Sequence, residues 1–325
     1  MKDRKAVLRF GSRSASLLPD LIQLVRAPAA LSVPGDVLVG AAATGSPVGI
    51  RTLGAMGSSV CLYWAGMALN DYADAAVDAV ERPQRPIPSG RVPRRTALGV
   101  ACGLTAAGLG LAFTAAGRRG LVRALPLAGV VWAYDLKLKS TPAGPVAMAS
   151  ARALDVLMGA LPVGDRRLWR QAAVPAALIG AHTYTVTELS RREVTGATAG
   201  LPATTLAASA ATAIAVAAPP VRTAARLLRQ ADGTPATRRF RRAFLHAGVA
   251  VAATLSYAAT YGTAQVRAVR KPSGANVQRA VGAGILSLMP LQAALTARAG
   301  APAAAAVLGV GHPLARRLAR RISPT

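Results

Sequence analysis

Acidic residues are scarce in this chain and gather in one short stretch. The 325 residues include only 13 Asp and Glu, and residues 70–78 read Asn-Asp-Tyr-Ala-Asp-Ala-Ala-Val-Asp. In a helix, Asp71, Asp74 and Asp78 would lie at i, i+3 and i+7, on one face. Three carboxylates on one face repel one another unless a cation lies among them. Because Mg²⁺ prefers oxygen ligands and commonly accompanies phosphate-bearing substrates, the spacing indicates a magnesium and phosphate site. A solvated acidic helix end is the alternative.

The composition of the chain is typical of an integral membrane protein. Of its residues 52% are hydrophobic and 16% are charged, and the mean hydropathy is +0.36. A formal net charge of +26 would favour nucleic acid as the partner of a soluble domain. Here the Lys and Arg residues lie mostly between long uncharged runs, as charges that flank membrane spans do. We therefore expect membrane lipid, and no nucleic acid, as a partner.

Apolar segments long enough to cross a bilayer recur along the whole chain. A spanning helix needs roughly 20 apolar residues. Nine segments fit this requirement approximately: 27–50, 52–70, 96–116, 120–134, 141–164, 171–187, 197–221, 243–266 and 280–297. Residues 299–315 are more weakly apolar and would form a tenth span. We expect an all-α, polytopic transmembrane helical bundle of about nine spans, or ten, which forms a single domain over residues 1–325.

The charged segments between these spans predict the orientation of the chain. Residues 81–95, directly after the acidic stretch, carry five arginines and are expected on the cytoplasmic side. Residues 188–196 end the sixth span and, by alternation, face the same side. Residues 222–242 carry seven arginines, yet strict alternation places them outside, against the charge rule. Either the span count shifts by one, or this segment lies in the membrane interface.

Two ionisable residues lie near the middle of the predicted fifth span. Arg152 and Asp155 are separated by three positions within the apolar segment 141–164. Charged groups at this depth are expensive and commonly mark a functional site that faces a wet cavity. The same i, i+3 spacing also allows a purely structural ion pair between the two side chains. We favour the functional interpretation.

The assembled pattern resembles the UbiA superfamily of membrane prenyltransferases. Residues 70–78 fit its Asn-Asp-x-x-Asp-x-x-x-Asp motif at every fixed position, and residues 85–90, Arg-Pro-Ile-Pro-Ser-Gly, are similar to its basic tail. The sequence Arg-Ala-Pro at positions 26–28 is a further similarity. Residues 134–159 are most similar to the EboC-like branch of the superfamily. The hydropathy pattern of the chain is similar to that of this superfamily over nearly its whole length.

The resemblance implies a mechanism and roles for individual residues. Members bind an isoprenyl diphosphate through Mg²⁺ held by two acidic motifs, and an acceptor captures the allylic carbocation once the diphosphate leaves. By match, the catalytic and metal-binding acids would be Asp71, Asp74, Asp78 and Glu188, and Glu193 would be a further metal ligand. The diphosphate would contact Asn70, Arg82, Arg85, Lys137, Lys139, Arg152, Asp155, Arg191 and Arg192. The resemblance therefore implies prenyl transfer to an unidentified acceptor, in the inner membrane of a bacterial cell, with the acidic motifs on the cytoplasmic side.

The second acidic motif departs from the pattern of the superfamily. Where that pattern has Asp-x-x-x-Asp before a glycine, this chain has Glu188 and Arg192, followed by Glu193 and Gly196. In a helix, Glu193 would point about 100° away from the position that Arg192 occupies. Arg192 could instead contact phosphate directly. The alternative function is therefore a UbiA-like lipid-binding or carrier protein whose chemistry is altered or lost.

Overall fold

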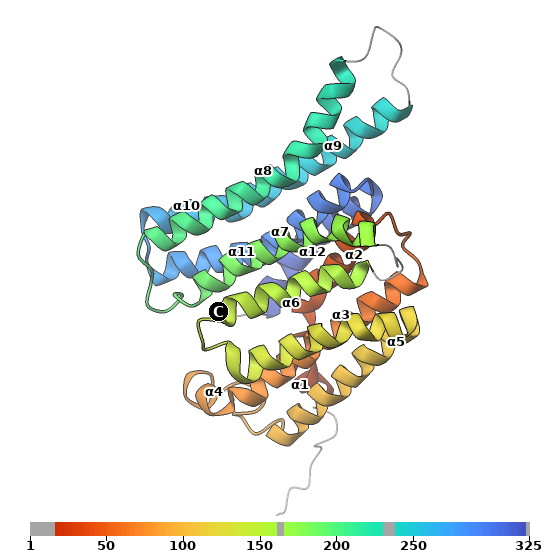
Figure 1. The fold of residues 1–325 in the computed structure, drawn as a ribbon. Coiled ribbons are helices and arrows are strands. Elements are labelled where there is room, and N and C mark those ends of the chain that lie inside the picture. The colour runs from red at the N-terminus through yellow and green to blue at the C-terminus, as the bar shows by residue number, and fades with distance from the viewer. Residues whose placement is uncertain (1–16, 161–165, 230–237, 323–325) are drawn as a thin grey trace, which may run out of the picture.

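The computed structural model describes residues 17–160, 166–229 and 238–322, and every regular element within them is a helix (Figure 1). The all-α prediction is therefore confirmed. The α-helices are α1 (Leu17–Leu24), α2 (Val33–Ala43), α3 (Ile50–Ala73), α4 (Ala75–Glu81), α5 (Arg94–Ala133), α6 (Gly144–Gly159), α7 (Arg166–Ser190), α8 (Gly200–Arg229), α9 (Arg238–Tyr257), α10 (Thr263–Arg270), α11 (Gly274–Arg298) and α12 (Pro302–Ile322). A 3₁₀-helix, η1 (Ala27–Ser32), and two π-helices, η2 (Tyr134–Leu138) and η3 (Ala258–Gly262), complete the set.

The helices correspond in order to the predicted spans. Five described segments are long and apolar enough to cross a membrane: Ile50–Ala73, Arg94–Leu138, Gly200–Arg229, Phe240–Arg270 and Gly274–Arg298. The other predicted spans correspond to helices that are shorter or more charged, such as α2 and α6. The total of nine or ten spans remains a prediction.

The helix α5 contains the predicted third and fourth spans and reverses direction between them. Helical geometry breaks at Ala116 and Gly117, and Gly117 has a φ of 60°, a left-handed conformation that glycine adopts without strain. After the reversal, Gly120 lies so close to the backbone of Ala112 that a Cβ atom would overlap the Ala112 carbonyl oxygen. These two glycines therefore allow a tight reversal between the spans.

The centre of the bundle is α11. All residues from Ser287 to Ala297 are buried, and a helix that is covered on all sides occupies the core of a helical protein. One hydrophobic cluster includes Ile179 of α7, Val216 of α8, Tyr257 of α9 and Leu291 of α11. The helix that carries the second acidic motif, α7, is thereby fixed to the core.

The helices α2 and α6 cross with their backbones in contact. A Cβ atom at Gly40 would overlap the carbonyl oxygen of Val156, and one at Gly159 would overlap that of Val37. Small residues permit this approach between membrane helices. The contact lies one turn after Asp36 on α2 and one turn after Asp155 on α6. The two acidic residues therefore lie on helices whose backbones touch.

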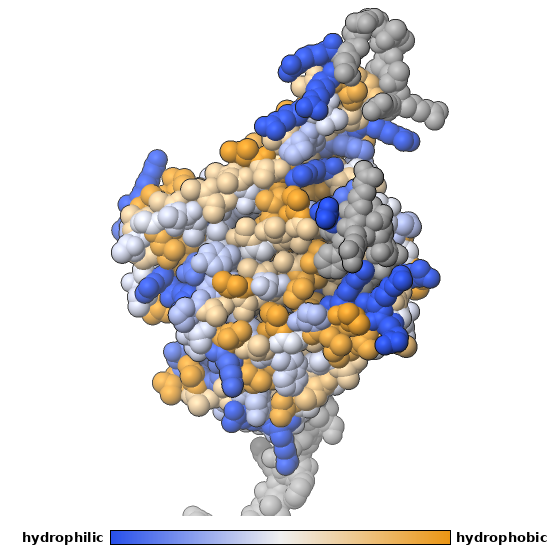
Figure 2. Space-filling view, in the orientation of Figure 1, coloured by the Kyte–Doolittle hydropathy of each residue, from blue (hydrophilic) through white to orange (hydrophobic). Residues whose placement is uncertain are grey.

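The described parts of the Arg-rich segment between the predicted seventh and eighth spans lie at the end of α8 and the start of α9, at the described tip of the α8–α9 hairpin. This tip projects from the bundle at the end opposite α4 (Figure 1), and hydrophilic side chains gather over it (Figure 2). The 30 residues of α8 extend about 45 Å, beyond the roughly 30 Å of a hydrocarbon core. The side of the membrane on which this segment lies, and with it the span count, stays a prediction. Residues 230–237 of this segment lie outside the described residues.

Candidate functional site

The first acidic motif lies where α3 meets α4, and it is not one continuous helix. The helix α3 ends at Ala73, and Asp74 has a φ of −88° and a ψ of 6°, so the predicted single helical face is wrong in this detail. The backbone N–H of Asp74 still donates to the carbonyl of Asn70 at 2.9 Å, and that of Asp78 donates to Asp74 at 2.8 Å. The change of direction separates the three carboxylates into a pair, Asp71 and Asp78, and a separate group, Asp74.

Arginine side chains neutralise the pair of carboxylates. The Nη1 atom of Arg85 lies 2.6 Å from Asp78 and 3.4 Å from Asp71, and both carboxylates are almost completely buried. Arg26 Nη2 donates to Asp71 at 3.0 Å, and Arg82 Nη1 lies 3.7 Å from Asp78. The basic tail and the Arg-Ala-Pro sequence therefore contact the acidic motif directly.

The remaining members of the motif contact the segment after α5. Lys139 Nζ lies 2.6 Å from Asp74, and Asn70 Nδ2 donates to the buried carboxylate of Asp135 at 3.2 Å. The sequence analysis assigned no role to Asp135, which is buried here by the π-helix η2. Lys137, which the resemblance placed at the diphosphate, is exposed to solvent.

The second motif lies next to the first. The helix α7 ends at Ser190, so Arg192 and Glu193 lie in a turn and the predicted helical angle between them does not apply. Burial raises the pKa of Glu193 above its ordinary value, and the guanidinium of Arg82 opposes this shift from close by. The two motifs therefore meet at one end of the bundle, as the alternation of spans predicted.

The other members of the second motif differ in their surroundings. The side chain of Glu188 is half-buried, whereas Arg191 and Arg192 are exposed. Arg191 Nη1 donates to the carbonyl oxygen of Thr141 at 2.5 Å, which connects this turn to the segment between η2 and α6. Gly196 has a φ of 77°, and a Cβ atom there would lie 2.9 Å from the Pro272 carbonyl oxygen. This position therefore favours glycine.

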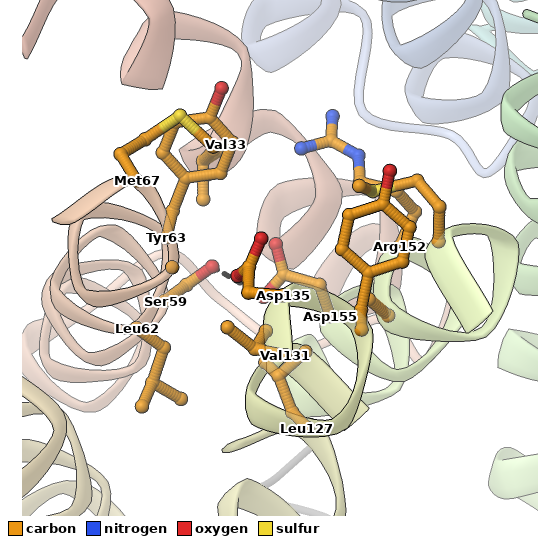
Figure 3. Close-up of a pocket in the computed structure, with 14 residues that line it drawn as sticks. Val33, Ser59, Leu62, Tyr63, Met67, Leu127, Val131, Asp135, Arg152 and Asp155 are labelled. Carbon is orange, nitrogen blue, oxygen red and sulfur yellow. Dashed lines mark hydrogen bonds between the residues drawn. The ribbon is translucent and has the colours of Figure 1, made fainter. Parts of the chain in front are cut away.

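A mostly apolar cavity of about 70 Å³ lies between the helices (Figure 3), and Asp135, which accepts a hydrogen bond from Asn70 of the first motif, lines it. Asp135 lines it near the motif, and Ser59, Arg152 and Asp155 line it deeper in the bundle. The other lining residues are Val33, Leu62, Tyr63, Gly66, Met67, Leu127, Val131, Tyr134, Met148 and Ala151. Arg152 and Asp155 line a cavity, as expected, although its walls are mostly apolar, and the functional interpretation of the pair stays a prediction.

A buried polar cluster occupies the deep part of this cavity. Arg152 Nε lies 2.9 Å from the carboxylate of Asp36 on α2, so its ion pair is with Asp36 and not with Asp155. Gln292 Nε2 of α11 donates to Asp36 at 2.7 Å, and the hydroxyl of Ser59 on α3 donates to Asp155. The sequence analysis noted no role for Asp36 or Gln292, because their contacts join segments far apart in the chain.

The chemistry of the first motif suits a divalent cation with oxygen ligands. In the described residues, no group of three or more His, Cys, Asp or Glu side chains is close enough to hold a metal ion. The carboxylates of Asp71 and Asp78 nevertheless converge on one cationic nitrogen of Arg85, which lies between them as a metal ion would. Two buried carboxylates that share a cation provide the hard oxygen donors that Mg²⁺ prefers.

Comparison with known proteins identifies relatives of this chain. A model of the UbiA prenyltransferase family matches residues 33–261. Digeranylgeranylglyceryl phosphate synthase of Methanopyrus kandleri is 42% identical over 110 residues, which cover 34% of this chain and 38% of that protein. The same enzyme of Pyrococcus abyssi is 40% identical over 116 residues, which cover 35% of this chain and 42% of that protein. This chain thus matches less than half of the length of these curated relatives.

Solved structures share the fold. A UbiA homolog from Aeropyrum pernix K1 has a TM-score of 0.53 and 18% identity, covering 79% of this chain and 96% of that one. A UbiA homolog from Archaeoglobus fulgidus bound to DMAPP and Mg²⁺ has a TM-score of 0.51 and 15% identity, covering 83% and 99%. The family match extends over more than half of the chain, the fold agrees, and the two motifs meet at one end of the bundle, so this protein is an integral membrane protein that belongs to the UbiA prenyltransferase family.

Proposed function

We propose that this protein transfers an isoprenyl group from an isoprenyl diphosphate to an acceptor within the membrane, and that it requires Mg²⁺. The observation that carries the proposal is the convergence of the Asp71 and Asp78 carboxylates on one nitrogen of Arg85, at the motif end of an apolar cavity. Buried acids with nearby arginines can hold a cation and an anion together, which a diphosphate substrate requires.

The residues of the two motifs divide this task. Asp71, Asp74 and Asp78 would hold Mg²⁺, with Glu188 and Glu193 of the neighbouring motif as further ligands. When bound, Mg²⁺ would neutralise the negative charge that develops on the departing diphosphate. Arg26, which lies beside Asp71, and the arginines that surround Asp78 would bind the diphosphate oxygens. Arg191 and Arg192 are exposed near this end of the bundle and would assist them.

The cavity supplies the second requirement of the reaction. Its walls are mostly apolar, from Val33 to Met148, and such walls keep water away from an allylic cation that would otherwise be hydrolysed. The allylic carbon would enter the cavity beside Asp135, since Asn70 of the motif contacts that residue. The acceptor would approach this carbon from within the cavity.

The comparisons support this proposal without identifying the acceptor. The curated relatives are named as synthases of digeranylgeranylglyceryl phosphate, and one structural neighbour holds DMAPP and Mg²⁺. The relatives are archaeal, whereas the inner membrane of a bacterial cell is our proposal for this protein. We further propose that both motifs face the cytoplasm, because the arginines of residues 81–95 adjoin the first motif.

Product analysis tests the proposed activity. The purified protein in detergent would be incubated with isoprenyl diphosphates of several lengths, Mg²⁺ and a metabolite extract, and prenylated products would be identified by mass spectrometry. We expect products that disappear in EDTA and in the Asp74→Ala variant. Binding of the diphosphate without any product would favour the carrier alternative. Diphosphate binding that is unchanged in Asp74→Ala would remove the metal site from the proposal.

A further inference from the structure

We propose that Arg152 and Asp155 form a binding site for a neutral hydroxyl group at the deep end of the cavity, and that a small hydroxyl-bearing acceptor supplies it. This inference rests on the proposed function, because it concerns the second substrate of the same reaction. It also departs from the role that the resemblance implied for these two residues, which was contact with the diphosphate.

The depth of the pair separates it from the diphosphate. Asp155 accepts a hydrogen bond from Ser59, which precedes Asn70 on α3 by eleven residues, or about 16 Å along the helix axis. The long side chain of Arg152, three residues earlier on α6, is anchored at its Nε by Asp36. A diphosphate held at Asp71 and Asp78 would therefore lie far from this pair, toward the motif end of α3.

The charges around Arg152 exclude an anion as its ligand. Asp36 is fully buried, pairs with Arg152 and is fixed by a hydrogen bond from Gln292. The guanidinium is thus already neutralised, and the carboxylate of Asp155 lies three residues away on the same helix. A phosphate or carboxylate placed here would meet two carboxylates and a single cation, which Asp36 already neutralises. A neutral polar group would avoid this repulsion.

The hydrogen-bonding groups at this site match those of a hydroxyl. Among the described residues, the buried Nη2 of Arg152 has no hydrogen-bond partner, although polar groups buried in proteins are almost always paired. Arg152 is an obligate donor, and the carboxylate of Asp155 is an acceptor when it is ionised. A hydroxyl can accept from the first and donate to the second. Both side chains line the cavity together (Figure 3).

The cavity leaves room for a small acceptor between the two ends. On α3 its wall runs from Ser59 to Met67, eight residues or about 12 Å. Asp135 lies near the Met67 end of this wall, where the allylic carbon would enter. Asp155 lies near the Ser59 end. A compact molecule with two or more hydroxyl groups could bind the deep pair through one group and present another to the allylic carbon.

Matched neutral and anionic ligands test the inference directly. The melting temperature of the purified full-length protein would be measured with Mg²⁺ and the unreactive donor analogue dimethylallyl thiolodiphosphate. The added probes would be glycerol against glycerol 1-phosphate, myo-inositol against inositol 1-phosphate, and 4-hydroxybenzyl alcohol against 4-hydroxybenzoate. We expect at least one neutral probe to stabilise the protein more than its anionic counterpart. Stabilisation by no neutral probe, or a preference for the anions, would overturn the proposal.

Substitutions then separate binding from a purely structural role of the cluster. Asp155→Asn keeps the shape of the side chain but replaces one of its two acceptor oxygens with an N–H donor. It should weaken binding of the neutral probe about tenfold. The double variant Asp36→Leu, Arg152→Met removes the ion pair as a unit and should also abolish the effect of the probe. Gln265→Leu removes a buried polar group elsewhere, between α10 and α8, and should leave probe binding unchanged.

The outcomes of this experiment distinguish the two proposals. If the donor analogue and Mg²⁺ alone fail to stabilise the wild-type protein, the proposed function fails. If the donor analogue stabilises all the variants, but neutral probes bind Asp155→Asn as tightly as the wild type, the hydroxyl site is wrong and the cluster is a structural connection between α2, α3, α6 and α11.

Discussion

One guanidinium nitrogen of Arg85 forms ion pairs with two buried carboxylates. Its Nη1 lies 2.6 Å from Asp78 and 3.4 Å from Asp71, whose side chains are 3% and 4% exposed. In the Arg85→Ala variant, Asp78 would keep only the distant contact with Arg82 at 3.7 Å, and Asp71 would keep Arg26. We predict that this variant is destabilised without Mg²⁺ and that Mg²⁺ restores most of the lost stability.

The size of the effect follows from burial. Breaking a buried ion pair by removing one partner costs about 3–5 kcal/mol. The side chain of Arg85 is 19% exposed and two arginines remain, so we expect about 2–3 kcal/mol, a change of roughly 30- to 150-fold in the unfolding equilibrium. Because the removed guanidinium lies between the two carboxylates, Mg²⁺ can take its place there, and it should stabilise the variant more than it stabilises the wild type.

Thermal or denaturant unfolding in a mild detergent, in EDTA and in millimolar Mg²⁺, measures both quantities. Arg91→Ala is the matched control, since Arg91 pairs with Asp20 away from the motif. The control also loses an ion pair with a buried carboxylate, but it should show the same response to Mg²⁺ as the wild type. If Arg85→Ala is as stable as the wild type in EDTA, or if Mg²⁺ shifts the variant and the wild type equally, the shared-cation reasoning is refuted.

Four further predictions address other features of the molecule. A cysteine at Ser89 should react only with reagents that reach the cytoplasm, and labelling of intact cells by an impermeant maleimide would reverse the proposed orientation. Arg192→Ala should weaken diphosphate binding roughly tenfold to a hundredfold, measured by titration, whereas Arg192→Lys should retain part of it; equal affinities would exclude a phosphate contact. Because the folded-state pKa of Glu193 is raised, its ionisation opposes folding as pH rises through that pKa. Glu193→Gln should therefore raise the melting temperature at pH 7, and this gain should shrink below the ordinary glutamate pKa. Gly117→Ala should lower the melting temperature, since φ is 60° there; an unchanged value would indicate that the reversal in α5 relaxes.

The parts of the site that lie close together in the sequence could be predicted. The spacing predicted that Asp71 and Asp78 lie together, and in the structure both contact Arg85 of the basic tail. A metal site at these acids stays a prediction. The apolar segments also gave the helices in the right order, because hydrophobic length is a strong signal in membrane proteins. The break in helical geometry at Ala116 and Gly117 lies at the predicted boundary between the third and fourth spans.

The parts that depend on packing could not be predicted. Asp36 was the only charged residue in the first predicted span, and nothing in the sequence connects it to Arg152 or to Gln292, 256 positions later. Arg152 and Asp155 share a helix, so an ion pair between them was the simplest structural alternative. The packing of α2 against α6 gives Arg152 a different partner. Asp135 is closely followed by two lysines, so the sequence indicated a basic segment between spans and not a buried acid. Its burial depends on how η2 contacts α3.

The contact between Gly40 and Gly159 bears on the electrical insulation of the membrane. Buried acids in a row across a bilayer can pass protons from one side to the other, and Asp36 and Asp155 with their polar neighbours form the start of such a row. One turn further along, the two backbones touch with no space for a side chain between them. The buried polar cluster therefore cannot extend between α2 and α6 beyond this crossing, because no water molecule or further polar side chain fits between the two backbones there.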